Sequence, residues 1–305
     1  MLALVTDASP SGVSLVEVAA PTPAADQAVV AVKAVSLNRG EVRMLPGAPG
    51  RRPGWDVAGV IARAAADGSG PAVGARVFGY VPSLVSDAPG TWAQQVAVST
   101  RRLAVLDDRV SFADASTVPI AGLTALAAVE RGGALRGTKV LVTGASGAVG
   151  AFAIELARHA GAEVTALVDR PERAQAVRAD HVATTLDAAV GPFALVVESV
   201  GGATLGHALT QVAAGGAIVS FGNSSGQTTT FDVTRFFLEH RARLEGYIVF
   251  ADDPGTRELA QLSSHVADGV LHPRVALTTS WREAGAAIAA VRDRKIAGKA
   301  VLTVD

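Results

Sequence analysis

The sequence predicts an α/β protein with two domains, one rich in β-strands and one built on a doubly wound parallel sheet. Its 305 residues exceed the usual length of a single domain, and 49% are hydrophobic against 18% charged, which is the balance of a folded chain. Short apolar runs separated by Gly, Pro and Asp fill residues 1–117, and strand and helix patterns alternate over residues 118–252. Punctuated short strands are typical of a barrel-like domain, and the alternation is typical of a parallel sheet.

The first domain is expected to consist of short strands, completed by the end of the chain. The apolar amino terminus, interrupted by Asp7, predicts a first strand rather than a leader peptide. Further strands are expected at Val13–Val18, Ala28–Val35, Val57–Ala62, Arg76–Val81 and Trp92–Val98. After two helices, the second with Ala284, Ala287, Ile288 and Val291 on one face, the last strand, Ala300–Val304, returns to this domain. Residues 253–305 therefore belong with residues 1–117.

The second domain, residues 118–252, is expected to alternate strands with helices. The helices are predicted at Ala125–Arg131, Val149–Ala160, Pro171–Val177 and Ala203–Val212. The strands are predicted at Val140–Thr143, Glu163–Val168, Phe193–Val197, Ala217–Phe221 and Tyr247–Phe250. The last two are expected near an open sheet edge, and because an apolar edge is commonly covered by two-fold pairing, they favour a homodimer.

A glycine-rich turn follows the strand Val140–Thr143. Gly144, Gly147 and Gly150 are spaced three apart, and the run Ala145, Ser146, Gly147, Ala148, Val149 and Gly150 fits a dinucleotide-binding fingerprint with Ala at its first Gly. Without side chains at the glycines, a pyrophosphate can approach the amide groups at a helix N-terminus. The alternative is a turn that serves packing alone.

Two features near the end of the next strand bear on the choice of dinucleotide. Asp169 stands nineteen residues past Gly150, where a carboxylate commonly binds the ribose hydroxyls of NAD. Arg170 and Arg173 follow at once, and either can bind the 2′-phosphate of NADP. We expect NADP(H) to be favoured and NAD(H) to be possible, with a solvated surface cluster as the alternative for all three residues.

Composition excludes several other kinds of chemistry. The chain has no cysteine, so disulfides, thiolate catalysis and Cys-ligated zinc are excluded. Its six histidines lack metal-ligand spacing, and no metal is expected. A net charge of −1 without a basic stripe argues against nucleic acid, and no apolar segment is long enough to span a membrane. We expect a cytoplasmic protein with a small-molecule substrate.

Five stretches resemble the zinc-free quinone oxidoreductase branch of the medium-chain dehydrogenase/reductase superfamily. They are SLNRGEV (Ser36–Val42), PGWDVAGVI (Pro53–Ile61), STVPIAGLTAL (Ser116–Leu126), VSFGNSSG (Val219–Gly226) and the terminal Gly298–Leu302. The resemblance implies a GroES-like catalytic domain, a Rossmann cofactor domain, and hydride transfer from NAD(P)H to a quinone or an α,β-unsaturated carbonyl. Where zinc-dependent relatives carry ligands, this chain has Asn38 and the pair Trp55 and Asp56.

The resemblance also implies roles for individual residues. Asn38 and Thr124 are expected to donate hydrogen bonds to the substrate carbonyl, and Tyr80 to donate a proton. The alternatives are a turn residue for Asn38, a helix cap for Thr124, and a half-buried strand residue for Tyr80. The cofactor is expected to contact Thr124, Ser199, Val200, Gly201, Phe221, Gly222, Asn223 and Lys299, besides the glycine turn and its basic neighbours. Two other functions stay open: a biosynthetic enoyl reductase of the same fold, and a non-catalytic dinucleotide sensor.

Overall fold

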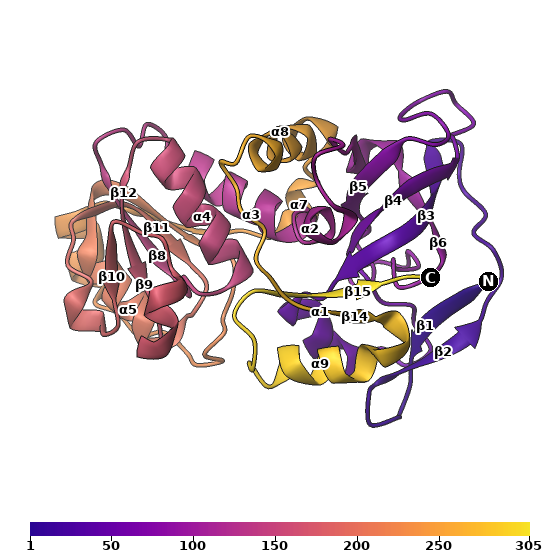
Figure 1. Cartoon of the computed structure of the whole chain (residues 1–305). Coiled ribbons are helices and arrows are strands. Elements are labelled where there is room, and N and C mark those ends of the chain that lie inside the picture. Colours follow the sequence, from indigo (N-terminus) through magenta and orange to yellow (C-terminus); the bar gives the residue numbers. More distant parts are fainter. The chain divides into compact units, whose positions relative to one another are not determined.

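The computed structural model describes all 305 residues, and the chain forms two compact units (Figure 1). Unit 1 comprises Met1–Leu123 and Asp252–Asp305, and unit 2 comprises Thr124–Ala251. The chain enters unit 2 within the helix α3 (Pro119–Glu130) and leaves it within the short helix α7 (Val249–Asp252).

Unit 2 contains a six-stranded sheet in which every neighbouring pair is parallel. The strands are β8 (Lys139–Thr143), β9 (Glu163–Leu167), β10 (His181–Ala183), β11 (Phe193–Glu198), β12 (Val212–Ser220) and β13 (Arg243–Gly246). Their spatial order is β10-β9-β8-β11-β12-β13, which is the order of a Rossmann sheet, with its switch point between β8 and β11. The near-continuous apolar runs of β8 and β11 suit strands that are buried on both faces.

Helices link and cover these strands. The helix α4 (Ala148–His159) packs on β8 and β9, and α5 (Gly202–Gln211) packs on β11 and β12 (Figure 1). The link from β9 to β10 is only a 3₁₀ helix, η3 (Pro171–Ala176), where the sequence predicted a helix. Ligands of such sheets bind beyond the carboxyl ends of the strands, near the switch point.

Unit 1 is organised around a mixed sheet of seven strands and a separate antiparallel pair. The seven strands are β3 (Gln27–Ser36), β4 (Asp56–Arg63), β5 (Arg76–Tyr80), β6 (Gln95–Ser99), β7 (Leu103–Val105), β14 (Val275–Ser280) and β15 (Lys299–Thr303), and the pair is β1 (Leu2–Thr6) with β2 (Val13–Glu17). The long strand β3 pairs with β4, β6 and β15. The return of the chain end is therefore a strand pairing, between β15 and β3.

The helices of unit 1 are α1 (Arg39–Met44), α2 (Phe112–Ser116), α8 (Thr256–Ala267) and α9 (Ala284–Arg292). The predicted inner face of α9 is buried in one core with strand residues such as Val32 and Leu302. Together the two units confirm the predicted class, a GroES-like β-rich domain and a Rossmann domain. None of the helices combines the length and the apolar character that a membrane span requires.

One strand prediction was wrong, and other strands were missed. The segment Tyr247–Phe250 is not a strand, because the edge strand β13 lies earlier, at Arg243–Gly246, and α7 begins at Val249. The charged residues Arg243 and Glu245 of β13 hid it, since an edge strand exposed to solvent needs no apolar run. The segment Ala217–Phe221, predicted near the edge, lies in and just after β12, the strand next to the edge strand β13. The polar strand β14 was not predicted.

Candidate active site

The glycine-rich turn joins the carboxyl end of β8 to the first turn of α4. Gly147 is the N-cap of α4, and its N–H donates to the carbonyl of Gly144 at 2.9 Å. A Cβ on Gly150 would lie 2.7 Å from that carbonyl and 2.8 Å from the Cα of Ala145, so Gly150 lets the helix pack on the turn. A Cβ on Gly147 would meet only the same carbonyl, at 3.2 Å. The space beside Gly147 is thus left open at a helix N-terminus, where an anion is favoured.

A buried carboxylate shapes the neighbouring loop at the end of β11. Glu198 is fully buried, and its Oε1 accepts the N–H groups of Val200 at 2.7 Å and Gly201 at 2.9 Å, together with the hydroxyl of Thr143 at 3.2 Å. The N–H of Ser199 donates to the Thr143 hydroxyl at 3.0 Å. One side chain therefore ties β11 to β8 at the switch point of the sheet.

The loop after β12 is bound to the loop after β11. The N–H groups of Ser224 and Ser225 donate to the carbonyls of Ser199 and Val200, at 3.0 and 2.9 Å. The side chain of Asn223 accepts from the N–H of Gly226 at 3.1 Å, which closes the turn that begins after Phe221 and Gly222. The structure thus gathers all the predicted loop residues of unit 2 at one edge of the sheet.

The basic residues that follow β9 lie against the glycine turn. Nη1 of Arg173 is 3.5 Å from the hydroxyl of Ser146 and 4.0 Å from Oδ1 of Asp169. The Arg173 side chain is 13% exposed and that of Asp169 is 57% exposed. The guanidinium is therefore held over the turn, next to the exposed carboxylate, while Arg170 is the N-cap of η3.

Unit 1 contains a buried polar cluster made of Ser36, Asn38, Asp56 and Lys299. Oδ2 of Asp56 accepts the Ser36 hydroxyl at 2.7 Å, Nδ2 of Asn38 at 2.8 Å and Nζ of Lys299 at 3.0 Å. Its Oδ1 accepts the N–H of Ile120 at 2.9 Å. Four donors match the acceptor capacity of a carboxylate, so Asp56 is fully satisfied as an anion.

Glu41 is a second buried carboxyl group beside this cluster. It lies in the first turn of α1, where its Oε2 accepts the N–H of Asn38 at 3.3 Å, and its Oε1 has no hydrogen-bond partner. Burial raises the pKa of Glu41 to about 8, and the charge of Asp56 adds to the rise. The charge of Lys299 opposes the shift. Asn38 is the N-cap of α1, which agrees with the alternative that it is a turn residue. Its side chain nevertheless belongs to the Asp56 cluster.

Tyr80 is held at the point where the chain returns to unit 1. Its hydroxyl donates to Oδ1 of Asp253 at 3.0 Å and to the carbonyl of Pro254 at 2.8 Å, and Nε of Arg102 donates to the same Oδ1 at 2.6 Å. Burial, and then the charge of Asp253, raise the pKa of Tyr80. This arrangement fits a residue that anchors the returning chain better than the predicted proton donor.

The other predicted residues lie in different settings. Thr124 is buried within α3, five residues after Pro119, so it does not cap that helix. Lys299, predicted to contact the cofactor, directs its ammonium group to Asn38 and Asp56. Reasoning from the sequence missed Glu41 and Glu198 altogether, although each is a charged residue beside apolar neighbours, a signal of buried polar chemistry.

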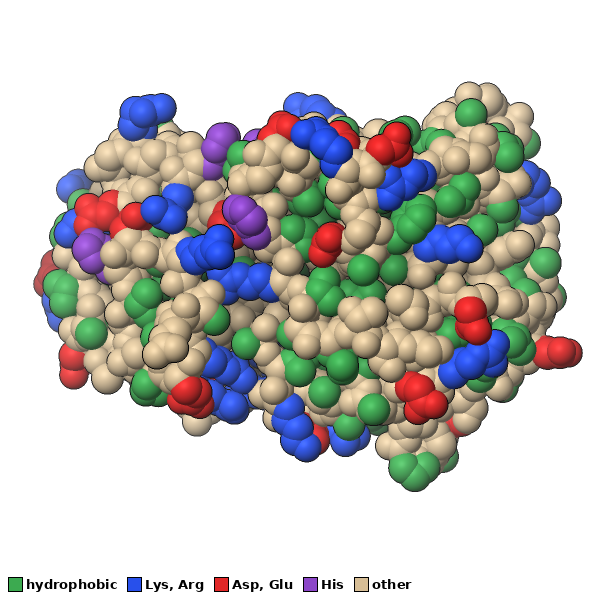
Figure 2. Space-filling model, viewed as in Figure 1, with side chains coloured by type: hydrophobic (Ala, Val, Ile, Leu, Met, Phe, Trp, Pro, Cys, Tyr) green, Lys and Arg blue, Asp and Glu red, His purple; other side chains and the backbone are tan.

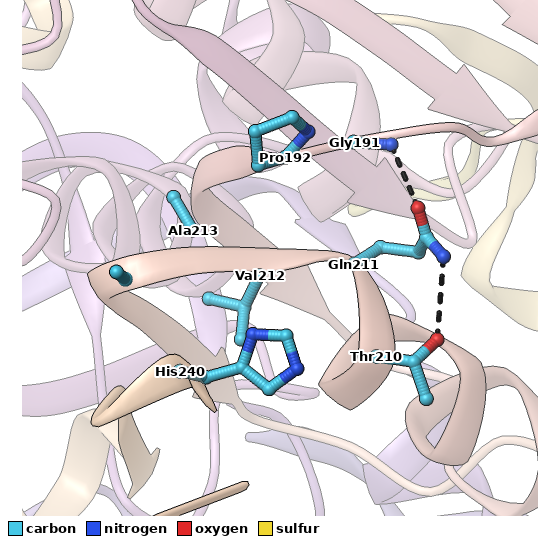
Figure 3. Close-up of a pocket in the computed structure, with 8 residues that line it drawn as sticks. Gly191, Pro192, Thr210, Gln211, Val212, Ala213 and His240 are labelled. Atoms are coloured by element: carbon cyan, nitrogen blue, oxygen red, sulfur yellow. Dashed lines mark hydrogen bonds between the residues drawn. The ribbon is translucent and has the colours of Figure 1, made fainter. Parts of the chain in front are cut away.

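A surface cavity of unit 2 lies away from the glycine turn and from the loops after β11 and β12. It has a volume of about 320 Å³ and is lined by Gly191, Pro192, Thr210, Gln211, Val212, Ala213, Ala214 and His240. Figure 3 shows the amide of Gln211 bridging the N–H of Gly191 and the hydroxyl of Thr210. Because β11 and β12 begin here, the cavity is at the amino ends of these strands and is not the nucleotide site.

Comparisons with known proteins agree with this geometry. The family of zinc-binding dehydrogenases matches residues 148–267. The spectinabilin polyketide synthase system protein NorB of Streptomyces orinoci is 34% identical over 94% of this chain, and the 2-methylene-furan-3-one reductase of Solanum lycopersicum is 32% identical over 47% of it. The chain spans only 14% and 39% of these two relatives, respectively.

Solved structures share the whole fold. The quinone oxidoreductase of Coxiella burnetii has a TM-score of 0.83 at 24% identity, over 100% of this chain and 99% of its own. The CurK enoyl reductase has a TM-score of 0.84 at 21%, over 100% and 99%. The yhdH oxidoreductase of Salmonella enterica, in complex with NADP, has a TM-score of 0.82 at 22%, over the full length of both chains.

A Rossmann unit with a glycine turn, joined to a GroES-like unit, is an architecture that the oxidoreductases among the structural neighbours share. The chain is similar to the medium-chain dehydrogenase/reductase superfamily, through the zinc-binding dehydrogenase match over residues 148–267 and the whole fold it shares with oxidoreductases. The predicted resemblance to quinone oxidoreductases is confirmed, because two of the structural neighbours are quinone oxidoreductases and one relative is a chloroplast envelope quinone oxidoreductase homolog.

Proposed function

We propose that the protein transfers a hydride from NADPH to an α,β-unsaturated carbonyl compound, either an enone or a quinone. The observation that carries the proposal is the presence of two sites, one in each unit. Unit 2 has an open glycine turn at a helix N-terminus with Arg173 held over it, and unit 1 has a buried polar cluster in which an amide, Asn38, takes part. The first suits a phosphorylated dinucleotide, and the second suits a carbonyl group.

The residues of unit 2 fit a nicotinamide dinucleotide. The pyrophosphate would be held by the amide groups of Ser146, Ala148 and Val149, next to the space that Gly147 leaves open. Arg173 would bind the 2′-phosphate, with Arg170 beside it, which favours NADP over NAD. The loops after β11 and β12, which the N–H groups of Ser224 and Ser225 join, would flank the nicotinamide. When bound, the cofactor supplies the hydride.

In unit 1, Asn38 would donate a hydrogen bond to the substrate carbonyl. As hydride adds to the β-carbon, negative charge develops on that oxygen, and a fixed donor stabilises it without reorganisation. Thr124 is a second candidate donor on its motif position. A proton from solvent then completes the product, because the Tyr80 hydroxyl is committed to Asp253 and Pro254. No residue of this scheme requires a metal ion.

An enoyl thioester is the second candidate substrate. It is favoured by one observation, the 34% identity to a polyketide synthase system protein over nearly the whole chain. The chemistry is the same, since an enoyl thioester is also an α,β-unsaturated carbonyl compound. The two substrates differ in the group attached to the carbonyl carbon, which is a thioester sulfur in one and a carbon in the other.

We also propose a homodimer formed along the edge strand β13. Large apolar side chains are exposed on β13 and the segments beside it, namely Phe237 at 55%, Leu238 at 63%, Leu244 at 42% and Ile248 at 55%. Apolar groups in such number on a sheet edge are commonly covered by a second copy. Elsewhere charges of both signs are interspersed, as the face in Figure 2 shows. Light scattering at micromolar concentration should give twice the chain mass, and a monomer would refute the dimer.

The test of function is a turnover assay. Quinones, simple enones and an enoyl thioester such as crotonyl pantetheine are offered with NADPH and with NADH, and the loss of nicotinamide absorbance is followed. We expect turnover with NADPH and at least one of these acceptors. Tight NADPH binding without turnover of any acceptor would support a sensor instead.

A further inference from the structure

The orientation of the Asn38 amide is fixed by its two neighbours. Nζ of Lys299 lies 2.6 Å from Oδ1 of Asn38, and Nδ2 of Asn38 lies 2.8 Å from Oδ2 of Asp56. An ammonium group can only donate hydrogen bonds and a carboxylate can only accept them. The reverse orientation of the amide would put donor against donor and acceptor against acceptor, so chemistry alone excludes it.

The same contacts leave one N–H of the amide uncommitted. Nδ2 carries two hydrogens, of which Asp56 takes one. Asn38 is 9% exposed, whereas Asp56 is fully buried and Lys299 is 5% exposed. Asn38 is therefore the member of this trio with the most access to a ligand, and what it can offer there is a donor.

The ammonium group also strengthens that donor. A cation on the carbonyl oxygen of an amide polarises the whole group, and hydrogen bonds in a chain reinforce one another in a medium of low dielectric. The second N–H thereby becomes a better donor to a developing oxyanion. Lys299 and Asp56 also hold each other at 3.0 Å, so neither charge is buried without a partner.

We propose that Lys299, with Asp56, is a positioning residue that locks the Asn38 amide as a hydrogen-bond donor toward the substrate carbonyl. This rests on the proposed function and departs from the prediction that Lys299 contacts the cofactor. Asn38 and Lys299 are 261 residues apart in the chain. The pairing of β15 with β3, in which Val301 faces Ser36, brings them together.

The kinetic test is a double-mutant cycle of Lys299→Met and Asn38→Ala, with Lys295→Met as the control. Lys295 lies on the same terminal segment and is 71% exposed. If Lys299 acts through Asn38, Lys299→Met should lower kcat about 30-fold in the wild type and less than about 3-fold in the Asn38→Ala background. Lys299→Arg keeps the cation and should recover much of kcat.

Cofactor binding separates this role from the alternative. We expect the Kd for NADPH of Lys299→Met, measured by calorimetry, to stay within about 2-fold of wild type. A cofactor ligand would lose at least about 10-fold. Equal losses of kcat in both backgrounds, or weakened NADPH binding, would overturn the proposal. If Lys299→Met fails to fold, the same cycle is run with Lys299→Ala and Asn38→Ala, and an equal loss of kcat in both backgrounds would overturn the proposal.

A spectroscopic measurement keeps the test independent of turnover. The Asn38 side-chain amide gives a pair of ¹H–¹⁵N signals, assigned by their absence from Asn38→Ala. They should shift strongly in Lys299→Met, and not in Lys295→Met. If the wild type turns over no acceptor, the proposed function fails, but these signals still decide the orientation. Signals that stay in place in Lys299→Met would overturn it.

Discussion

The two units each use a buried carboxylate, but in different ways. In unit 2, Glu198 accepts hydrogen bonds from the backbone of its own loop, two and three residues further along the chain. In unit 1, Asp56 accepts from side chains on other segments, the farthest being Lys299, 243 residues away. Unit 2 thus presents backbone groups shaped by local sequence, whereas unit 1 presents side chains assembled by the fold. This division suits a protein that binds a common cofactor and a particular substrate.

The largest expected effect concerns the glycines of unit 2. Gly147→Val should leave the protein folded and raise the Kd for NADPH at least about 100-fold, because the side chain fills the open space at the helix N-terminus. Gly150→Val should instead destabilise the fold by roughly 3 kcal/mol, since its Cβ overlaps backbone.

Calorimetry and thermal unfolding measure these two effects. Gly47→Val is the control, because Gly47 is exposed and a Cβ there meets nothing within 4 Å. A Gly147→Val protein that binds NADPH within about 2-fold of wild type would mean that the turn serves packing alone.

Next in size is the loss of the Glu198 carboxylate. Glu198→Ala leaves two backbone N–H groups and the hydroxyls of Thr143 and Ser220 without their acceptor, and unsatisfied buried groups cost about 1 to 3 kcal/mol each. We expect a lower melting temperature and NADPH binding weakened about 10-fold, as the loop loses its shape. Asp56→Ala should also lower the melting temperature but leave NADPH binding unchanged. If both variants weaken cofactor binding equally, the division between the units is wrong.

Arg173 tests the selectivity of the nucleotide site. Arg173→Ala should reduce the ratio of kcat/KM for NADPH over NADH about 10-fold, or about 1.4 kcal/mol, through loss of a charge-assisted hydrogen bond to the 2′-phosphate. Asp169→Ala should move the ratio the other way, because it removes a carboxylate that repels that phosphate. Steady-state kinetics with both cofactors decide, and an unchanged ratio in both variants would place the 2′-phosphate elsewhere.

The last effect, which concerns stability and not cofactor binding, is a pH dependence that arises in unit 1. The folded-state pKa of Glu41, about 8, lies above its ordinary value of 4.5, so between these values the folded protein holds a proton that the unfolded chain has lost. The stability it contributes is complete below pH 4.5 and is lost as pH rises through 8, by an amount on the order of 1 to 3 kcal/mol. Urea unfolding at pH 5 and pH 8.5 should show this loss in the wild type. Glu41→Gln, which cannot ionise, should show much less, and an equal loss in both proteins would contradict the assignment.

The same contrast explains what the sequence could predict. The glycine turn, the strands of the Rossmann sheet and the loops after β11 and β12 depend on residues close in the chain, so their pattern is visible in one stretch. The trio of Asn38, Asp56 and Lys299 depends on pairings between distant strands, and no local pattern reveals it. The family resemblance pointed to all three residues, but it predicted that Lys299 contacts the cofactor, whereas Lys299 binds Asn38 and Asp56.

The errors in predicting elements have a similar cause. The edge strand β13 and the strand β14 are formed by pairing with β12 and β15, and their own residues are half polar. The apolar run Tyr247–Phe250 looked more like a strand than either. Whether a strand is buried depends on the tertiary structure, so the β-propensity of its residues indicates a strand reliably only at the centre of a sheet.

The central claim is hydride transfer from NADPH to a carbon conjugated with a carbonyl group. The most direct measurement uses NADPH deuterated at the transferred position of the nicotinamide, with 2-cyclohexenone or crotonyl pantetheine as acceptor, and locates the label in the product by NMR. The account predicts deuterium at the β-carbon of the product and a slower turnover than with unlabelled NADPH. Product without deuterium, or NADPH that stays bound and unoxidised with every acceptor, would contradict it.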